Sequence, residues 1–172
     1  MSTLLIGCGQ ITWRGVPEEQ VLAEIAQAGY VGAPAGLKKD ATVAEVIALY
    51  ARYGLQPAPG YLGADYWDKS QEASILQRAR DYASFAKAAG CTELYVAAGG
   101  FNNYITKRGL TRNQIAGHVK AEDAMSDAEY AQFARVLNLV GEITLEQGSR
   151  VVSTTMWAAR LRRGQRSTAF GP

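Results

Sequence analysis

Histidine and cysteine are scarce in this sequence, which has one histidine, His118, and two cysteines among its 172 residues. Glu122 and Asp123 follow His118 closely, but no second histidine and no thiol stands at metal-ligand spacing from it. The sequence therefore predicts no metal site, and we can assemble no Ser-His-Asp or Cys-His catalytic set from it. We expect His118 to be an inert surface residue. We expect Cys8 and Cys91 to be buried and reduced.

Long apolar runs are also missing. No run approaches the roughly 20 residues that span a bilayer, and the N-terminus has no basic segment followed by an apolar stretch. These absences lead us to expect a cytoplasmic protein with no membrane partner. Acidic and basic residues nearly balance, with a formal net charge of +2. This balance gives no reason to expect nucleic acid as a partner of the globular part.

Acidic residues are absent from the last part of the chain. All 16 of them precede Ser149, whereas five of the 18 basic residues, all arginines, follow it. No helical or strand period is evident beyond Val151 and Val152. We therefore divide the chain into a globular part, residues 1–148, and an Arg-rich tail, residues 149–172, which we expect to be loosely ordered. A nucleic-acid arm is a weaker interpretation of the tail, because aromatic residues do not interleave with its arginines.

Expected strands and helices alternate along the globular part. The expected strands are residues 4–8, 30–35, 55–61, 94–98 and 150–153. Apolar residues at helical spacing separate them, as at Ile75 and Ala79, and Ser126 with Glu129 forms a capping box before the last helix. A long polar connection, residues 101–125, is of a kind that is functional or disordered in compact domains. The alternation predicts an α/β protein with a parallel sheet.

A nucleotide site is a weak alternative at the first strand. Gly7-Cys8-Gly9 follows that strand as a dinucleotide fingerprint would, but Thr12 stands in place of the third glycine. No acidic residue ends the second strand to hold a ribose. We therefore expect no nucleotide cofactor.

Aromatic and amide side chains gather just after the expected strands. They are Trp13, Tyr61, Tyr66, Trp67, Phe101, Asn102 and Asn103. In a (β/α) barrel these strand ends carry the active site. Aromatic rings there can stack on a sugar ring, and the asparagines can hydrogen-bond its hydroxyls. For any single residue, packing beneath a loop is the alternative, but as a group they predict a substrate-binding site, without any assignable catalytic residue.

Several segments of the globular part resemble one family. They are Gly9–Trp13, Leu22–Gly32, Ala88–Cys91 and Ser126–Gly148. They resemble inosose dehydratase and, more broadly, the xylose-isomerase-like TIM barrels, which include sugar isomerases and epimerases. The resemblance implies an incomplete (β/α)8 TIM barrel of about four βα units plus a fragment of strand five. It also implies a small-molecule sugar or inositol derivative as the ligand.

The resemblance implies the chemistry of intact relatives as well. A divalent metal (Mn, Mg or Co) assists proton abstraction from a ketose or keto-inositol, and its ligands come mostly from later strands of the barrel. We expect none of these ligands in this chain, which would then be inactive alone. Pro34 also stands where relatives commonly carry an acidic residue.

The tail departs from the family, and a shifted reading frame explains how. Around strand five, dehydratase-type relatives have a motif close to His-Asn-His-Val-Gly, whereas this chain has Thr154–Ala158. If codons are built from the last base of one codon and the first two of the next, Met156-Trp157 must encode Val and Trp157-Ala158 must encode Gly. His, Asn and His are permitted before them. We therefore expect the tail to be a frame-shift product, which the nucleotide sequence across codons 148 to 172 would test.

A half-barrel would leave strand edges and an inner face uncovered. We expect Ile6, Tyr95 and Val96 to be exposed on that face. Unpaired edges and apolar patches favour association. The alternative to a truncated enzyme is therefore a non-catalytic half-barrel that self-associates or pairs with a second half.

Overall fold

A computed structural model describes residues 5–99 and 102–153 of the chain. Its helices are α1 (Glu18–Gln27), α2 (Val43–Arg52), α3 (Glu72–Ala88), α4 (Arg112–Ile115) and α5 (Asp127–Glu146), with 3-10 turns η1 (Lys69–Gln71) and η2 (Ala121–Asp123). Its strands are β1 (Gly32–Pro34), β2 (Gln56–Ala58), β3 (Tyr61–Ala64), β4 (Glu93–Ala98) and β5 (Arg150–Ser153). The expectations for residues 154–172, loose order and a shifted frame, lie outside the described residues.

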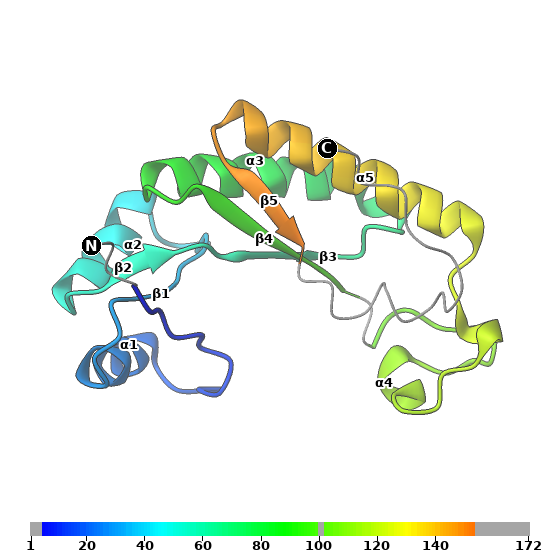
Figure 1. Cartoon of the computed structure of the whole chain (residues 1–172), viewed down its shortest axis with the longest axis horizontal. Helices are drawn as coiled ribbons and strands as arrows, with labels where there is room; N and C mark the ends of the chain where they lie inside the picture. The colour runs from blue at the N-terminus through cyan, green and yellow to red at the C-terminus, as the bar shows by residue number, and fades with distance from the viewer. Residues whose placement is uncertain (1–4, 100–101, 154–172) are drawn as a thin grey trace.

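Every strand pair is parallel, and neighbouring strands follow the order of the chain. β1 pairs with β2, and β4 lies between β3 and β5. Gly7 forms an isolated parallel bridge to Gly32, which places the first expected strand beside β1. Figure 1 shows α3 and α5 side by side on one face of the β3-β4-β5 sheet, while α1 and α4 lie at opposite ends of an open arch. This is the α/β architecture of an incomplete barrel, as predicted.

The third expected strand, residues 55–61, is broken in two, so the prediction of one strand there was wrong. The carbonyl of Ala58 accepts a hydrogen bond from the Ala35 N–H at 3.1 Å, whereas that of Gly60 accepts one from the Tyr95 N–H at 3.1 Å. The chain thus changes sheets between these residues, at Pro59, which has no N–H to donate to a ladder. A Cβ on Gly60 would lie 2.3 Å from the Ala35 carbonyl oxygen, so only glycine fits at the break.

The first expected strand is also shorter than predicted. Within residues 5–8 it contributes the Gly7 bridge and two backbone hydrogen bonds. Val31 donates to the Ile6 carbonyl at 3.0 Å, and Cys8 donates to the Gly32 carbonyl at 2.9 Å. Leu5 and Ile6 are exposed, 62% and 57% respectively. Among the described residues this segment has β1 on one side only, which limits its pairing.

Side chains alternate between the two faces of the β3-β4-β5 sheet. Leu62, Leu94 and Val96 are buried in a core cluster with residues of α3 and α5. The expectation that Val96 is exposed on the inner face was therefore wrong, because the period-2 alternation turns it toward the helices. Tyr61 and Tyr95 are register partners and lie on the opposite face, where their rings stack with centroids 5.4 Å apart.

Two local predictions have different outcomes. The Ser126 side chain accepts a hydrogen bond from the Glu129 N–H and begins α5, so the predicted capping box is confirmed. Cys8 and Cys91 are free thiols, but each is only partly buried, and Cys91 precedes β4. Full burial of both cysteines was therefore a wrong prediction. Among the described helices, none combines the length and apolarity that crossing a membrane requires.

Candidate functional site

The carboxyl ends of β3 and β4 meet at one edge of the sheet. Asp65 follows β3 directly, Gly99 follows β4 directly, and the Gly99 N–H donates to the Ala64 carbonyl at 2.8 Å. In α/β folds with parallel strands, ligands bind at this end of the sheet. We call the side chains that gather here, Asp65, Trp67, Asn103, Tyr104 and Arg112, the strand-end cluster.

Asp65 is a buried carboxylate within the strand-end cluster. Its side chain is held on two sides, since Asn103 Nδ2 donates to Oδ2 and Gly99 packs against Oδ1. Asp65 as a whole is 9% exposed. An ionised carboxylate only accepts hydrogen bonds, and its two oxygens offer about four acceptor positions. The carboxylate therefore keeps acceptor capacity for a hydroxyl group.

Two aromatic rings meet at a right angle beside this carboxylate. The ring centroids of Trp67 and Tyr104 lie 5.4 Å apart with an interplanar angle of 90°. The Arg112 Cζ atom lies 4.9 Å from each centroid, which is within the range of a cation–π contact. Arg112 also donates to the Gly99 carbonyl at 3.3 Å and so ties the connection after β4 to the end of that strand.

Burial changes the acidity of two groups in the cluster. Burial, and to a smaller extent the Glu129 carboxylate that accepts from the Tyr104 hydroxyl at 3.3 Å, together raise the pKa of Tyr104 to about 12. The Tyr104 hydroxyl therefore stays protonated and remains a donor at neutral pH. Burial also lowers the pKa of Arg112, because desolvation disfavours the charged guanidinium.

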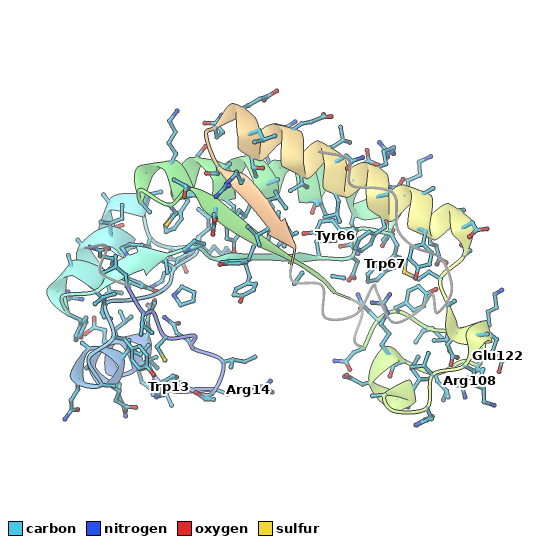
Figure 2. All side chains as sticks on the ribbon, viewed as in Figure 1. Trp13, Arg14, Tyr66, Trp67, Arg108 and Glu122 are labelled. Carbon is cyan, nitrogen blue, oxygen red and sulfur yellow. The ribbon has the colours of Figure 1, made fainter. Side chains whose placement is uncertain are left out.

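A separate ion pair lies at the outer end of the long connection. Arg108 Nε donates to Asp123 Oδ1 at 2.7 Å, and Glu122 Oε1 lies 3.8 Å from the same nitrogen. Figure 2 shows Arg108 and Glu122 together near α4. The guanidinium of Arg108 and the Lys120 N–H hold the pKa of Asp123 well below its usual range. This arrangement fixes the shape of the connection.

The structure does not bring all the predicted site residues together. Trp13 lies beside α1, where its Nε1 donates to Glu24 Oε2 at 2.7 Å and its ring packs against the core of α1 and α2. Figure 2 shows Trp13 and Trp67 at opposite ends of the arch. Tyr66 is fully buried, with its hydroxyl donating to the Leu62 carbonyl at 2.6 Å.

The other predicted residues are divided between different surroundings. Tyr61 begins β3 instead of following a strand, because of the break at Gly60. Asn103 and Trp67 belong to the strand-end cluster, and Asn102 Oδ1 accepts from Asn113 Nδ2 at 2.6 Å beside it. Phe101 lies outside the described residues.

Sequence reasoning missed Asp65, Tyr104 and Arg112. Asp65 carried a usable signal, since it lies next to Tyr66 and Trp67 at the same predicted strand end. Arg112 and Tyr104 lie in the long connection, whose sequence has no helical or strand periodicity that would predict their positions. Their contacts with Trp67 join residues more than 35 positions apart in the sequence and depend on the fold.

The described residues do not fit the divalent metal that the fold family implies. No group of three His, Cys, Asp or Glu side chains among them lies close enough to hold an ion. His118 is exposed, and its carbonyl accepts a 3.4 Å hydrogen bond from Arg108. We therefore derive no chemical step through a metal from this part of the chain.

Comparison with solved structures identifies the fold. A xylose isomerase domain protein from Alicyclobacillus acidocaldarius superposes with a TM-score of 0.62 over 87% of this chain and 49% of its own, at 16% identity. A D-allulose 3-epimerase from Methylomonas sp. gives 0.57 over 87% and 51%, at 16% identity. A xylose isomerase-like TIM barrel protein from Mycobacterium smegmatis, solved in complex with magnesium, gives 0.58 over 87% and 54%, at 15% identity.

This chain has the fold of half a TIM barrel, similar to that of xylose isomerase-like proteins. It spans about half the length of the solved structures it matches. No protein-family model and no curated protein matches the sequence. The half-barrel carries the strand-end cluster at the carboxyl ends of its strands, where TIM-barrel enzymes have their active sites. A specific relationship to inosose dehydratase stays a prediction.

Proposed function

We propose that this half-barrel supplies part of the substrate-binding surface of a sugar isomerase, epimerase or dehydratase acting on a ketose or keto-inositol. The observation that carries the proposal is the strand-end cluster, in which Asn103 donates to the buried carboxylate of Asp65 and the indole of Trp67 packs against Tyr104, at the carboxyl ends of β3 and β4. Two of the structures it resembles are sugar epimerases, of D-allulose and of L-ribulose.

Each member of the cluster has a role that its chemistry supports. Asp65 accepts a hydrogen bond from a substrate hydroxyl, and Asn103 fixes the orientation of that carboxylate. Trp67 offers an apolar ring face to the C–H groups of the sugar, and Arg112 holds the other side of the ring system in place. Metal-assisted proton abstraction belongs to the intact form, because the described residues contain no ligand set for an ion.

The direct test is binding of ketoses and keto-inositols to the purified chain, observed by saturation-transfer NMR. We expect saturation transfer to sugar protons, and we expect Asp65→Asn to weaken it because the neutral amide turns one acceptor into a donor. Trp13→Phe is the matched control, since Trp13 lies at the other end of the arch. Absence of transfer to every sugar tested, or an unchanged signal in Asp65→Asn, would contradict the proposal.

A non-catalytic half-barrel that self-associates is the second candidate. It is favoured by the stacked tyrosine pair on the face of the sheet opposite α3 and α5, where Tyr61 is 52% exposed and Tyr95 is partly buried. In a complete barrel this face is covered by side chains from the remaining strands. Assembly without any added metal or sugar distinguishes this candidate from the first.

A further inference from the structure

Arg112 carries a partly buried positive charge for which the described residues provide no ion pair. Its guanidinium donates to the Gly99 carbonyl at 3.3 Å and to the Met125 Sδ atom at 3.2 Å. A guanidinium has five N–H donors, and a thioether sulfur is a weak acceptor. Most of the hydrogen-bonding capacity of Arg112 is therefore unused within the described part of the chain.

The acidic residues near Arg112 accept hydrogen bonds from other groups. Glu129 Oε2 accepts from the backbone N–H and the hydroxyl of Ser126 at 2.7 and 2.8 Å, and from Tyr104 at 3.3 Å. Asp65 accepts from Asn103. Both carboxylates act on the Arg112 charge through space, but neither forms a salt bridge with it. The charge therefore has favourable surroundings but, among the residues that the structure describes, no counter-ion in contact.

Arg108, in the same connection, differs from Arg112 because it has ion-pair partners within the chain. Its side chain is 19% exposed, and the carboxylates of Asp123 and Glu122 both lie within ion-pair distance. The hydrogen bond to Asp123 raises the pKa of Arg108, whereas burial without such a partner lowers that of Arg112. Partial burial of a charge is unfavourable when no ion pair offsets it, and the described residues offer Arg112 none. Its retention beside the strand ends points to a partner that arrives from outside.

We propose that Arg112 binds an oxyanion, a phosphate or carboxylate group, of a ligand held at the carboxyl ends of β3 and β4. The rings of Trp67 and Tyr104 hold the guanidinium from two sides. This fixes the plane of a group whose fork of donors matches two oxygens of such an anion. The inference rests on the proposed function for its location and adds a charged group to the substrate class.

The test is titration of the full chain with inorganic phosphate and with sodium acetate, against sodium chloride at equal ionic strength. The indole N–H signal of Trp67, assigned with Trp67→Phe, reports binding by NMR. We expect a saturable shift with one of the two anions. Affinity should fall about ten-fold in Arg112→Gln and by a smaller factor in Arg112→Lys, which keeps the charge but loses the fork. Saturation by phosphate would indicate a phosphate ligand, and saturation by acetate would indicate a carboxylate ligand.

Arg80→Gln is the matched control, because it removes the same charge from an exposed position on α3 and should leave anion affinity unchanged. If Arg112→Gln does not fold, the anion affinity of Arg112→Lys, compared with that of the unmodified chain, still tests the inference. No saturable response to either anion, or equal affinity in the Arg112 variants, would overturn the inference. Anion binding without any response to sugars would contradict the proposed function alone, and a sugar response without anion binding would contradict this inference alone.

Discussion

Gly99 packs so closely against Asp65 that a Cβ on Gly99 would lie 2.2 Å from the Asp65 Oδ1 atom. The contact joins the residue after β4 to the residue after β3. The missing side chain at one strand end thus makes room for the buried carboxylate at the other. This carboxylate cannot simply move aside, because it is buried and accepts a hydrogen bond from Asn103.

Substitution of Gly99 by alanine should displace the Asp65 carboxylate and weaken binding of ketoses. We expect a loss of about 1–3 kcal/mol in the free energy of unfolding, which is typical of overpacking a buried site. Chemical denaturation measures the stability, and saturation-transfer NMR measures sugar binding. Gly141→Ala is the control, since nothing lies near its added methyl in α5 and alanine favours a helix interior. Equal stability of Gly99→Ala and the unmodified chain would contradict the close contact.

The break between β2 and β3 should tolerate no side chain at Gly60. Gly60→Ala would bring a methyl group within 2.3 Å of the Ala35 carbonyl oxygen, a backbone atom that moves only with its strand end. We expect a stability loss of about 2 kcal/mol or more, by the overpacking argument above. Gly63→Ala, on the same segment, meets no atom closer than 4.0 Å. It should change stability by less than about 0.5 kcal/mol. Similar melting temperatures for the two variants would contradict this account of the break.

Local signals in the sequence predicted the helices better than the strands. Ser126 and Glu129 lie three residues apart and cap α5 without help from the rest of the fold, so their pattern was sufficient. Pro57 and Pro59 mark an interruption of this strand in the sequence, but the close approach of Gly60 to Ala35, which lies far back in the chain, depends on the fold. The parallel α/β sheet could be predicted because alternation of strands and helices is a property of the chain order, whereas the incomplete barrel was implied by the resemblance to a known family.

The strand-end cluster was predictable only in part, for the same reason. Trp67 and Asn103 were found because they follow expected strands, and position along the chain was enough. Arg112 reaches the cluster by packing against Trp67 and Tyr104, and this depends on how residues 102–125 fold back over the sheet edge. Trp13 shared the strand-end signal of Trp67, but it packs beside α1 at the other end of the arch.

The Arg108–Asp123 pair should make the chain sensitive to acid. The folded-state pKa of Asp123 is lowered, so its stabilising contribution is present above its unfolded pKa of about 3.9 and is lost as the pH falls through the folded value. The melting temperature of Asp123→Asn should therefore be several degrees below that of the unmodified chain at pH 7. The difference between the two melting temperatures should become smaller below about pH 4. Thermal melts between pH 7 and pH 3 measure this. Asp81→Asn, on the exposed face of α3, should show no such narrowing. A difference that is independent of pH would contradict the role of the pair.

The stacked pair of Tyr61 and Tyr95 should drive association of the chain with itself. Tyr61 and Tyr95 stack on the sheet face opposite α3 and α5, and Val152 of β5 is the register partner of Tyr95 on the same face. An apolar row across three strands favours contact with a second surface of the same kind. Sedimentation velocity should therefore show mass that rises with concentration up to about 100 μM, without added metal or sugar.

Tyr61→Glu should return the chain to a monomer, because the contact would then bury an unpaired charge, which is strongly unfavourable. Tyr30→Glu provides the matched control, since Tyr30 is 37% exposed in the turn after α1, outside β3 and β4. It adds the same charge away from the tyrosine pair and should leave association unchanged. A chain that stays monomeric across the whole concentration range would contradict the prediction that the sheet face with Tyr61 and Tyr95 drives association. Equal dissociation by both variants would trace association to net charge instead of to the tyrosine pair.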